Sequence, residues 1–427
     1  MVESIISLSL RNRFIILLMA AGLFTWGVIA LRDSPIDALP DLSENQVIVF
    51  TEWMGRSPQL MEDQITYPLV SNLQGIPRIK NIRGTSMFGM SFVYVIFEDD
   101  VDIYWARTRV LERLNYAQRL LPPGITPALG PDGTGVGHVF WYHLDAPQLD
   151  LGEQRALQDW YVKFALQTVK GVAEVASYGG FEKQYQIVLD PVKMQFYKVS
   201  MMDVMNKVKA NNNDVGGRKF EMSDMAYVIR GLGYVKNKKD VENISLAQYN
   251  GVPVRVKDVG SVQMGGDLRL GILDVDGEGE VVGGIIVMRY GENADEVIKA
   301  VKTKMKEVEK GLPPGVTFKT SYDRSELIEA AIETIKGKLI EEIIVVCLVV
   351  LVFLFHWRSA LSIIIQIPVT IAISFILLEA FDMPSNLMSL TGIALAIGVI
   401  VDNGIILSEN SYRQLSEWQN NDHPENI

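Results

Sequence analysis

The chain has 427 residues, of which 48% are apolar and 21% are charged, and its mean hydropathy is +0.16. This mean is too apolar for an ordinary soluble enzyme and too polar for a protein that lies mostly within a membrane, so the distribution of the hydrophobic residues matters more. A net charge of −11 gives no electrostatic basis for binding nucleic acid, and the single cysteine, Cys347, excludes an intramolecular disulfide and a thiolate-rich metal site.

Four segments are the most hydrophobic stretches of the chain, and as helices they are about long enough to cross a bilayer. These predicted transmembrane helices are residues 14–31, 335–355, 360–381 and 387–410. Arg32-Asp33-Ser34-Pro35 follows the first segment in place of a small-residue cleavage site, so we interpret that segment as an uncleaved span rather than a signal peptide. The alternative is that these segments are buried helices of a large soluble protein.

The distribution of arginine predicts the orientation of the chain. Four arginines, Arg11, Arg13, Arg358 and Arg413, all fall on one side, whereas residues 382–386 contain no lysine or arginine. The positive-inside rule then places residues 1–13, the loop 356–359 and the tail 411–427 in the cytoplasm. The long stretch between the first two spans is predicted to lie outside, which in a Gram-negative cell means the periplasm, and the predicted location is the cell inner membrane.

The first part of this external stretch, residues 32–130, has a regular alternation of strand and helix patterns. Strands are predicted at 46–51, 79–82, 91–97 and 125–129, and helices at 57–73 and 102–121. The resulting β-α-β-β-α-β order is the split βαβ, or ferredoxin-like, pattern. The predicted fold class is therefore an α+β membrane protein.

A second copy of this unit follows in the sequence. Leu121-Pro122-Pro123-Gly124-Ile125-Thr126 recurs as Leu312-Pro313-Pro314-Gly315-Val316-Thr317, each between a helix and a short strand. Gly75-Ile76-Pro77-Arg78-Ile79 likewise echoes Gly171-Val172-Ala173-Glu174-Val175. We interpret these matches as an internal duplication. The second unit is split into residues 131–190, which include strands at 172–178 and 184–189, and residues 274–330. Residues 191–273 form an inserted third subdomain.

Several strings in this order resemble the heavy-metal efflux branch of the RND permeases. The strings are Asp37-Ala38-Leu39-Pro40-Asp41-Leu42, Tyr104-Trp105-Ala106-Arg107, Leu129-Gly130-Pro131-Asp132, Thr134-Gly135-Val136-Gly137, Ser321-Tyr322-Asp323-Arg324-Ser325, and the last span from Asn386 to Asn410. The resemblance covers the N-terminal portion of such a permease. It implies duplicated porter subdomains with an inserted docking subdomain.

The last span distinguishes between types within this branch. Ala396-Ile397-Gly398 stands where zinc and cobalt types carry Asp-Phe-Gly, so the chain resembles the copper/silver type. The resemblance implies proton-driven export of Cu(I) or Ag(I), with Met388 at a position that could bind the metal. Export of divalent metals or of drugs is an alternative within the same class. The resemblance also implies a homotrimer, a periplasmic membrane-fusion adaptor and an outer-membrane channel as partners, and no organic cofactor.

Asp402 is the residue that we expect to carry chemistry. A carboxylate inside an apolar span costs roughly 2.5–3.5 kcal/mol, so it is rarely present without a function. The spacing of Thr391, Gly398, Asp402 and Glu409 places them on one helix face, and a low dielectric favours the protonated carboxyl, so Asp402 could bind and release a proton. The resemblance makes Asp402 the proton-relay residue. The alternative is a structural polar contact.

Other candidate residues have weaker signals. The methionines Met201, Met202 and Met205, and the pair Met87 and Met90, could bind a soft metal, but we expect them to pack in a core. We expect His138 and His143 to face opposite sides of a strand and to make packing or single hydrogen-bond contacts. Glu341, Glu342 and Glu409 are interpreted as charges at helix ends near the membrane surface.

Two functions of different class remain open. RND permeases have about twice this length, and the resemblance places the periplasmic metal site and the relay partners of Asp402 in the second half. The chain is then either a split or truncated half of a transporter, or a non-transporting, membrane-anchored assembly module. A second reading frame downstream that encodes the remaining spans would favour the transporter.

Overall fold

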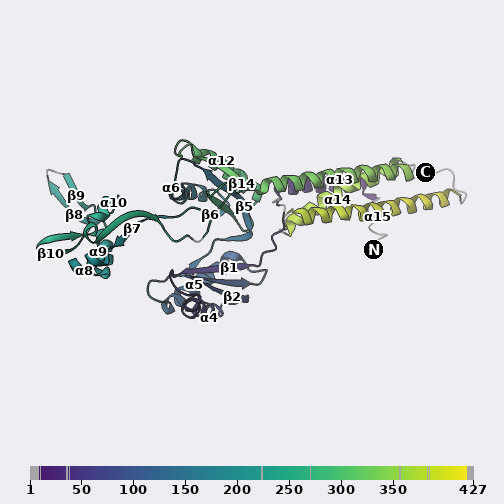
Figure 1. Ribbon diagram of the computed structural model, residues 1–427. Coiled ribbons are helices and arrows are strands. Elements are labelled where there is room, and N and C mark those ends of the chain that lie inside the picture. The colour runs from purple at the N-terminus through teal and green to yellow at the C-terminus, as the bar shows by residue number, and fades with distance from the viewer. Residues whose placement is uncertain are drawn as a thin grey trace.

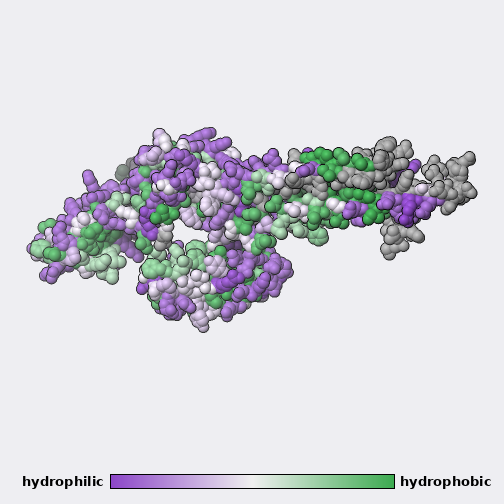
Figure 2. Space-filling model, turned by 45° about the vertical axis from the view of Figure 1, so that its right-hand side comes forward, coloured by the Kyte–Doolittle hydropathy of each residue, from purple (hydrophilic) through white to green (hydrophobic). Residues whose placement is uncertain are grey.

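The computed structural model describes residues 9, 11–34, 37, 39–222, 225–269, 271–354, 357–381, 383 and 385–420. Figure 1 shows an elongated molecule, with long helices at one end and units built on β-sheets at the other. Figure 2 shows that hydrophobic side chains gather along the helical end, whereas hydrophilic residues dominate much of the surface of the sheet-containing units. The uneven hydrophobicity expected from the composition therefore has a clear spatial counterpart.

All four hydrophobic segments form helices in the parts of the chain that the structure describes. They are α2 (Arg13–Asp33), α13 (Arg324–Leu354), α14 (Trp357–Ala380) and α15 (Leu387–Asn420). Among the described residues, Arg13–Arg32 and Leu387–Trp418 are long and apolar enough to cross a membrane, and Ile365–Ala380 is a shorter apolar helix. The first and fourth spans thus meet the length and composition of a membrane helix, and the second and third remain predictions.

The helix boundaries differ from the expected ones. The loop predicted at 356–359 is helical from Trp357 onward, because Trp357-Arg358-Ser359 contains no glycine or proline to end a helix. His356 itself lies outside the described residues, as do residues 1–8 and 421–427. Helix α13 begins at Arg324, eleven residues before the predicted span at 335, and α15 continues to Asn420.

The first sheet-containing unit has the predicted β-α-β-β-α-β order. Its elements are β1 (Gln46–Glu52), the continuous helix α3–η1–α4 (Pro58–Met61, Glu62–Thr66 and Tyr67–Leu73), β2 (Ile79–Met87), β3 (Met90–Phe97), α5 (Ile103–Ala117) with η2 (Gln118–Leu120), and β4 (Ala128–Leu129). The sheet order is β2-β3-β1-β4, with antiparallel pairing throughout. Val47, Val49 and Val95 of the sheet pack with Leu69 and Val110 of the helices in one buried core.

The second unit is assembled from two separate stretches of chain. Its elements are β5 (Gly133–Asp145), the helix α6–η3–α7 (Leu151–Leu157, Gln158–Val162 and Lys163–Gln167), β6 (Val172–Tyr178), β13 (Val282–Arg289), α12 (Ala294–Glu309) and β14 (Thr317–Asp323). The sheet order β14-β5-β13-β6 is fourth-first-third-second within the unit, as in the first unit. The split unit expected from the sequence therefore forms one sheet and one core.

Local backbone features also repeat between the two units. The first helix of each contains a five-residue π-helical segment, and Gly124 and Gly315 of the repeated hexapeptide have φ of 85° and 84°, a conformation that glycine adopts at little cost. The second pair of matching segments, which begin at Gly75 and Gly171, is aligned differently from our expectation. Gly171 (φ 84°) directly precedes β6, and the residue with positive φ directly before β2 is Arg78 (64°), so Gly75 is not its counterpart.

A third unit lies between β6 and β13. It contains α8 (Pro191–Tyr197), α9 (Met201–Asn211), β8 (Val215–Met222), β9 (Met225–Gly231), α10 (Lys238–Glu242), β10 (Ser245–Tyr249), β11 (Val252–Arg255) and α11 (Val256–Val259). A separate core includes Val204, Val241 and Val256. The strand expected at 184–189 in the second unit is β7 (Lys183–Leu189), and it pairs with β12 (Gly260–Gly266) because β13 occupies the place beside β6.

Helix α2 packs closely against α14 through a glycine. A β-carbon at Gly27 would overlap the backbone carbonyl and the side chain of Ala372, so only glycine permits this approach. The neighbouring Ala30 is also buried. Small residues allow helix backbones to come close in membrane proteins, where packing replaces the hydrophobic effect as the source of helix association. Gly22, on the same helix, has open space around it.

We expect Gly27→Val to destabilise the helical end, because the added side chain must displace Ala372 of α14. Forced overpacking of this kind costs about 1–3 kcal/mol. The measurement is the thermal unfolding midpoint of the detergent-solubilised protein. Gly22→Val is the matched control, since it adds the same side chain to the same helix without a steric conflict. Equal midpoints for the two variants would contradict the close contact.

Candidate functional site

The start of α15 is fixed by a reciprocal cap. The Oδ1 atom of Asn386 accepts hydrogen bonds from the backbone N–H groups of Met388 and Ser389, both at 3.0 Å. The Oγ atom of Ser389 accepts one from the backbone N–H of Asn386 at 2.9 Å. Caps of this kind satisfy N–H groups that the first helical turn leaves unpaired. The sequence string Asn386-Leu387-Met388-Ser389 is thereby explained as a helix start.

Asp402 lies on a side of α15 that the described chain does not cover. Ile397 and Val401 of α15 are buried, whereas Asp402 is exposed, as are Thr391, Gly398 and Glu409. Among the residues that the structure describes, none donates a hydrogen bond to Asp402 or forms an ion pair with it. The face expected from the spacing is thus present, and the Asp402 carboxylate lies among exposed apolar side chains that include Leu395, Val399 and Ile406.

Met388 lies far from Asp402 along α15. It is 65% exposed at the beginning of α15 and lies fourteen residues before Asp402, which corresponds to about 21 Å along a helix. The described part of the chain contains no group of three or more His, Cys, Asp or Glu side chains that could hold a metal. The residues predicted for the proton and for the metal therefore form two separate places in this chain.

The remaining sequence candidates divide into two groups. His143 is buried and shares a single hydrogen bond of 2.8 Å with Ser321, as expected, and burial together with Lys319 lowers the pKa of His143. The expectation that the methionines pack in a core is wrong for four of them. Met87, Met201, Met202 and Met205 are all exposed, because they occupy a hairpin end and the outer side of a helix.

A buried ion pair joins the helical end to the sheet-containing end. Arg324, the first residue of α13, lies 3.3 Å from the Oδ2 atom of Asp37, and their side chains are 5% and 18% exposed. The backbone N–H of Asp37 donates to the carbonyl of Ser385, and the hydroxyls of Ser34 and Ser385 are 2.6 Å apart. The end of α2, the start of α13 and the segment before α15 therefore meet at one point.

The other sequence strings that resemble the heavy-metal efflux branch also contact one another through side chains. The Thr134 hydroxyl donates to Asp41 at 2.8 Å, the Tyr104 hydroxyl donates to Asp132 at 3.2 Å, and Arg107 donates to the carbonyl of Gly130 at 2.9 Å. These residues come from four strings in three separate regions of the sequence, near residues 41, 105 and 132. The strings are thus explained as contacts between the linkers, α5 and the second unit, rather than as a catalytic constellation.

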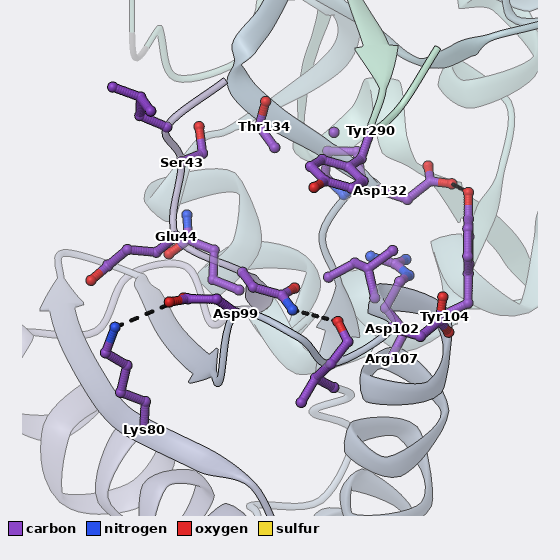
Figure 3. A pocket seen from close by; sticks show the side chains of 17 residues that line it. Ser43, Glu44, Lys80, Asp99, Asp102, Tyr104, Arg107, Asp132, Thr134 and Tyr290 are labelled. Atoms are coloured by element: carbon purple, nitrogen blue, oxygen red, sulfur yellow. Dashed lines mark hydrogen bonds and ion pairs between the residues drawn. The ribbon is translucent and has the colours of Figure 1, made fainter. Parts of the chain in front are cut away.

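These contacts surround a cleft of about 540 Å³ between the first and second units. Figure 3 shows Asp132 on one side of the cleft reaching toward Tyr104 of α5, with Glu44, Asp99 and Lys80 on the other side. Burial and the Asp132 carboxylate raise the pKa of Tyr104, so its hydroxyl stays protonated as a donor. Arg289 of β13 also contacts Asp132 at 3.2 Å. Asp132 thereby connects the first unit to the second.

The carboxylates of this cleft each have a partner. Glu44 pairs with Arg83 at 2.9 Å, Asp99 with Lys80 at 3.8 Å, and Asp102 accepts the backbone N–H of Trp105 at the start of α5. A cation would have to replace these contacts before it could bind. We therefore interpret the cleft as a junction between units and not as a metal site.

Sequence reasoning missed the arginine and lysine partners of these strings. Arg289 and Lys302 lie in β13 and α12, far from the strings in sequence, and no local pattern marks them. The Lys302 ammonium pairs with the Asp323 carboxylate and donates to the Ser325 hydroxyl at 3.1 Å. Burial raises the pKa of Asp323, but Lys302 and Ser325 outweigh burial and hold that pKa below its usual range.

Comparison with known proteins gives a consistent result. The model of the AcrB/AcrD/AcrF family matches residues 5–427. The whole chain is 47% identical to the cation efflux system protein CusA of Escherichia coli and covers 41% of that protein. It is 46% identical to the putative cation efflux system protein SilA of Salmonella typhimurium, with 99% of the chain and 41% of SilA covered.

Two further comparisons agree with these. The cobalt-zinc-cadmium resistance protein CzcA of Cupriavidus metallidurans is 35% identical over 98% of the chain and 40% of CzcA. The crystal structure of a heavy metal efflux pump superposes with a TM-score of 0.85 at 34% identity, over 96% of this chain and 41% of that one. The chain therefore spans about two fifths of the length of the proteins that it matches.

The Asp323 ion pair makes stability depend on acid pH. The pKa of Asp323 is depressed in the folded state, so its stabilising contribution is present above the unfolded value near 4 and is lost as pH falls through the folded value. We expect Asp323→Asn to lower the free energy of unfolding at pH 7 by roughly 1–3 kcal/mol, and by less at pH 3. Denaturant unfolding at both pH values measures this.

The control for this prediction is Glu307→Gln on α12. Glu307 is 60% exposed and pairs with Lys304 at 3.0 Å, so this pair should contribute little at either pH. If Asp323→Asn and Glu307→Gln had the same pH dependence, the pairing of the 8% exposed Asp323 side chain with Lys302 would not be the cause.

Proposed function

Because the chain belongs to the AcrB/AcrD/AcrF family of RND permeases, we propose that it is the N-terminal part of a proton-driven exporter of Cu(I) or Ag(I). RND permeases are inner-membrane transporters and not enzymes, and the relatives of this chain are cation efflux proteins. The observation that carries the proposal is the position of Asp402, a carboxylate on the uncovered face of apolar α15.

The architecture fits this function when the chain is placed in a membrane. Helices α2, α13, α14 and α15 cross the inner membrane four times, and the sheet-containing units lie in the periplasm. The first and second units are ferredoxin-like porter subdomains, comprising residues 32–130 and residues 131–190 with 274–330. Residues 191–273 are the docking subdomain. The repeated sheet order of the two units and the separate core of the third support this assignment.

Asp402 is the proton-relay residue of the proposed mechanism. A charged carboxylate at the centre of a span is unfavourable by roughly 2.5–3.5 kcal/mol, and protonation removes this cost. Binding of a proton from the periplasm and its release to the cytoplasm would therefore change how α15 packs against its neighbours. Gly398, one helical turn earlier and with open space around it, leaves room for a partner helix on this face.

The choice of Cu(I) and Ag(I) rests on the degree of similarity and on one motif. The chain is 46–47% identical to CusA and SilA but 35% identical to CzcA, whose name specifies cobalt, zinc and cadmium. Ala396-Ile397-Gly398 in α15 resembles the copper/silver type. Met388 is proposed as a metal contact at the periplasmic end of α15, where its thioether is exposed and suits a soft monovalent cation.

The partners of the complete transporter follow from the family. We propose a homotrimer that docks on a periplasmic adaptor and an outer-membrane channel. Since the chain covers 41% of CusA, transport by the complete protein also requires the portion that corresponds to the remainder of that relative. A membrane-anchored assembly module without transport activity is the alternative.

Metal tolerance tests the transporter against this alternative. A host that lacks its own copper and silver exporters would produce the chain alone, or the chain together with a C-terminal half from a relative. We expect tolerance to Ag(I) and Cu(I), but not to Zn(II), to rise only when both halves are present. Growth inhibition that stays unchanged with both halves would contradict metal export, and a gain for Zn(II) alone would contradict the choice of metal.

Replacement of Asp402 tests the proton relay. In the transporter with both halves, Asp402→Asn removes the titratable group and keeps the size of the side chain. We expect proton-coupled Ag(I) efflux from proteoliposomes with a pH gradient to fall to background, with assembly unchanged by size-exclusion chromatography. Glu409→Gln, on the same helix and also exposed, should keep efflux. Efflux retained by the Asn variant would sink the relay.

A further inference from the structure

Three methionines are exposed together on one helix of the third unit. Met201, Met202 and Met205 of α9 are 64%, 61% and 57% exposed. Methionine is among the residue types that are most often fully buried, so three exposed methionines within five positions need an explanation. The core of this unit is filled instead by Val204 on the same helix, with Val208 packed against it.

The helical spacing brings the three side chains together. Successive residues of an α-helix differ by about 100°, so Met201, Met205 and Met202 lie at about 0°, 40° and 100° around the axis. Met205 is four residues from Met201 and three from Met202, and such pairs have their β-carbons about 5–6 Å apart. Each side chain has three rotatable bonds beyond the backbone, so three thioether sulfurs can converge above Met205.

The side chains of Met201, Met202 and Met205 offer soft, uncharged thioether ligands, although the charged Asp203 lies between them in sequence. Thioethers select Cu(I) and related soft cations, whereas hard and borderline divalent cations prefer carboxylate, water or imidazole ligands. The one carboxylate within the triplet is already used, because Asp203 accepts hydrogen bonds from the backbone N–H and the hydroxyl of Ser200 in the cap of α9. Those hydrogen bonds also lower the pKa of Asp203.

We propose that Met201, Met202 and Met205 form a three-thioether site for Cu(I) or Ag(I) on the third unit. Its metal class rests on the proposed function, but its residues are separate from Met388 and Asp402 of α15. Figure 1 shows α9 at the end of the molecule that lies farthest from the helices α13, α14 and α15. The site captures the monovalent metal at the periplasmic surface, away from the membrane.

The test uses the full chain purified in detergent and titrated with Ag(I) in chloride-free buffer. Leucine preserves the apolar surface but lacks sulfur, so the triple variant M201L/M202L/M205L should bind one Ag(I) fewer than the unchanged chain by isothermal calorimetry. Cu(I)-loaded protein should also lose Cu–S scattering in X-ray absorption spectra. Met264→Leu, an exposed single methionine of β12, should change neither measurement.

Three outcomes would overturn the site. Ag(I) stoichiometry that is unchanged in the triple variant would show that the methionines are an apolar contact surface. Equal loss in the Met264→Leu control, or Zn(II) binding that disappears with the same triple variant, would contradict a soft three-thioether site. Failure of the proposed function is distinguishable, because a host could lack metal tolerance while the purified chain still binds Ag(I) through these residues.

Discussion

The buried ion pair between Asp37 and Arg324 is the constraint on which the arrangement of this chain depends. It joins the two ends of the long stretch between α2 and α13, just after α2 and at the start of α13. With both ends held there, and with Ser385 contacting Asp37, the segments that leave and enter the helical end share one anchor. A shift of α13 would therefore act on the segment that follows α2 and on the second unit, whose last strand β14 ends at Asp323.

The sequence predicted local elements well because helix and strand periodicity and turn residues are local signals. It indicated the duplication because Gly124 and Gly315 need the same positive φ in both copies. It failed where long-range packing decides the outcome. The partner of β7, the exposure of Met201, and the contacts of Arg289 and Lys302 each depend on residues that are distant in sequence. For the candidate site, the face of α15 was predictable from spacing alone.

The junction between the units and the role of Asp402 in the proposed transporter rest on different kinds of observation. The junction between units is a set of distances among residues of this chain, such as Tyr104 to Asp132, so its role in holding the units is physical. The role of Asp402, in contrast, is inferred because the described residues offer it no opposite charge and no hydrogen-bond donor. The proton-relay role of Asp402 is therefore a proposal that rests on its position on the apolar helix α15.

The paired strands β7 and β12 have a consequence for how the third unit could evolve. Their register holds Lys183 directly opposite Gly266, so the two ends of the insertion are adjacent where they leave the second unit. Because its two ends are adjacent, the insertion connects to the second unit as a short hairpin would. Its length therefore adds little to the entropic cost of forming the sheet of the second unit. The third unit can therefore be enlarged, trimmed or exchanged as a cassette while the fold beneath it is conserved.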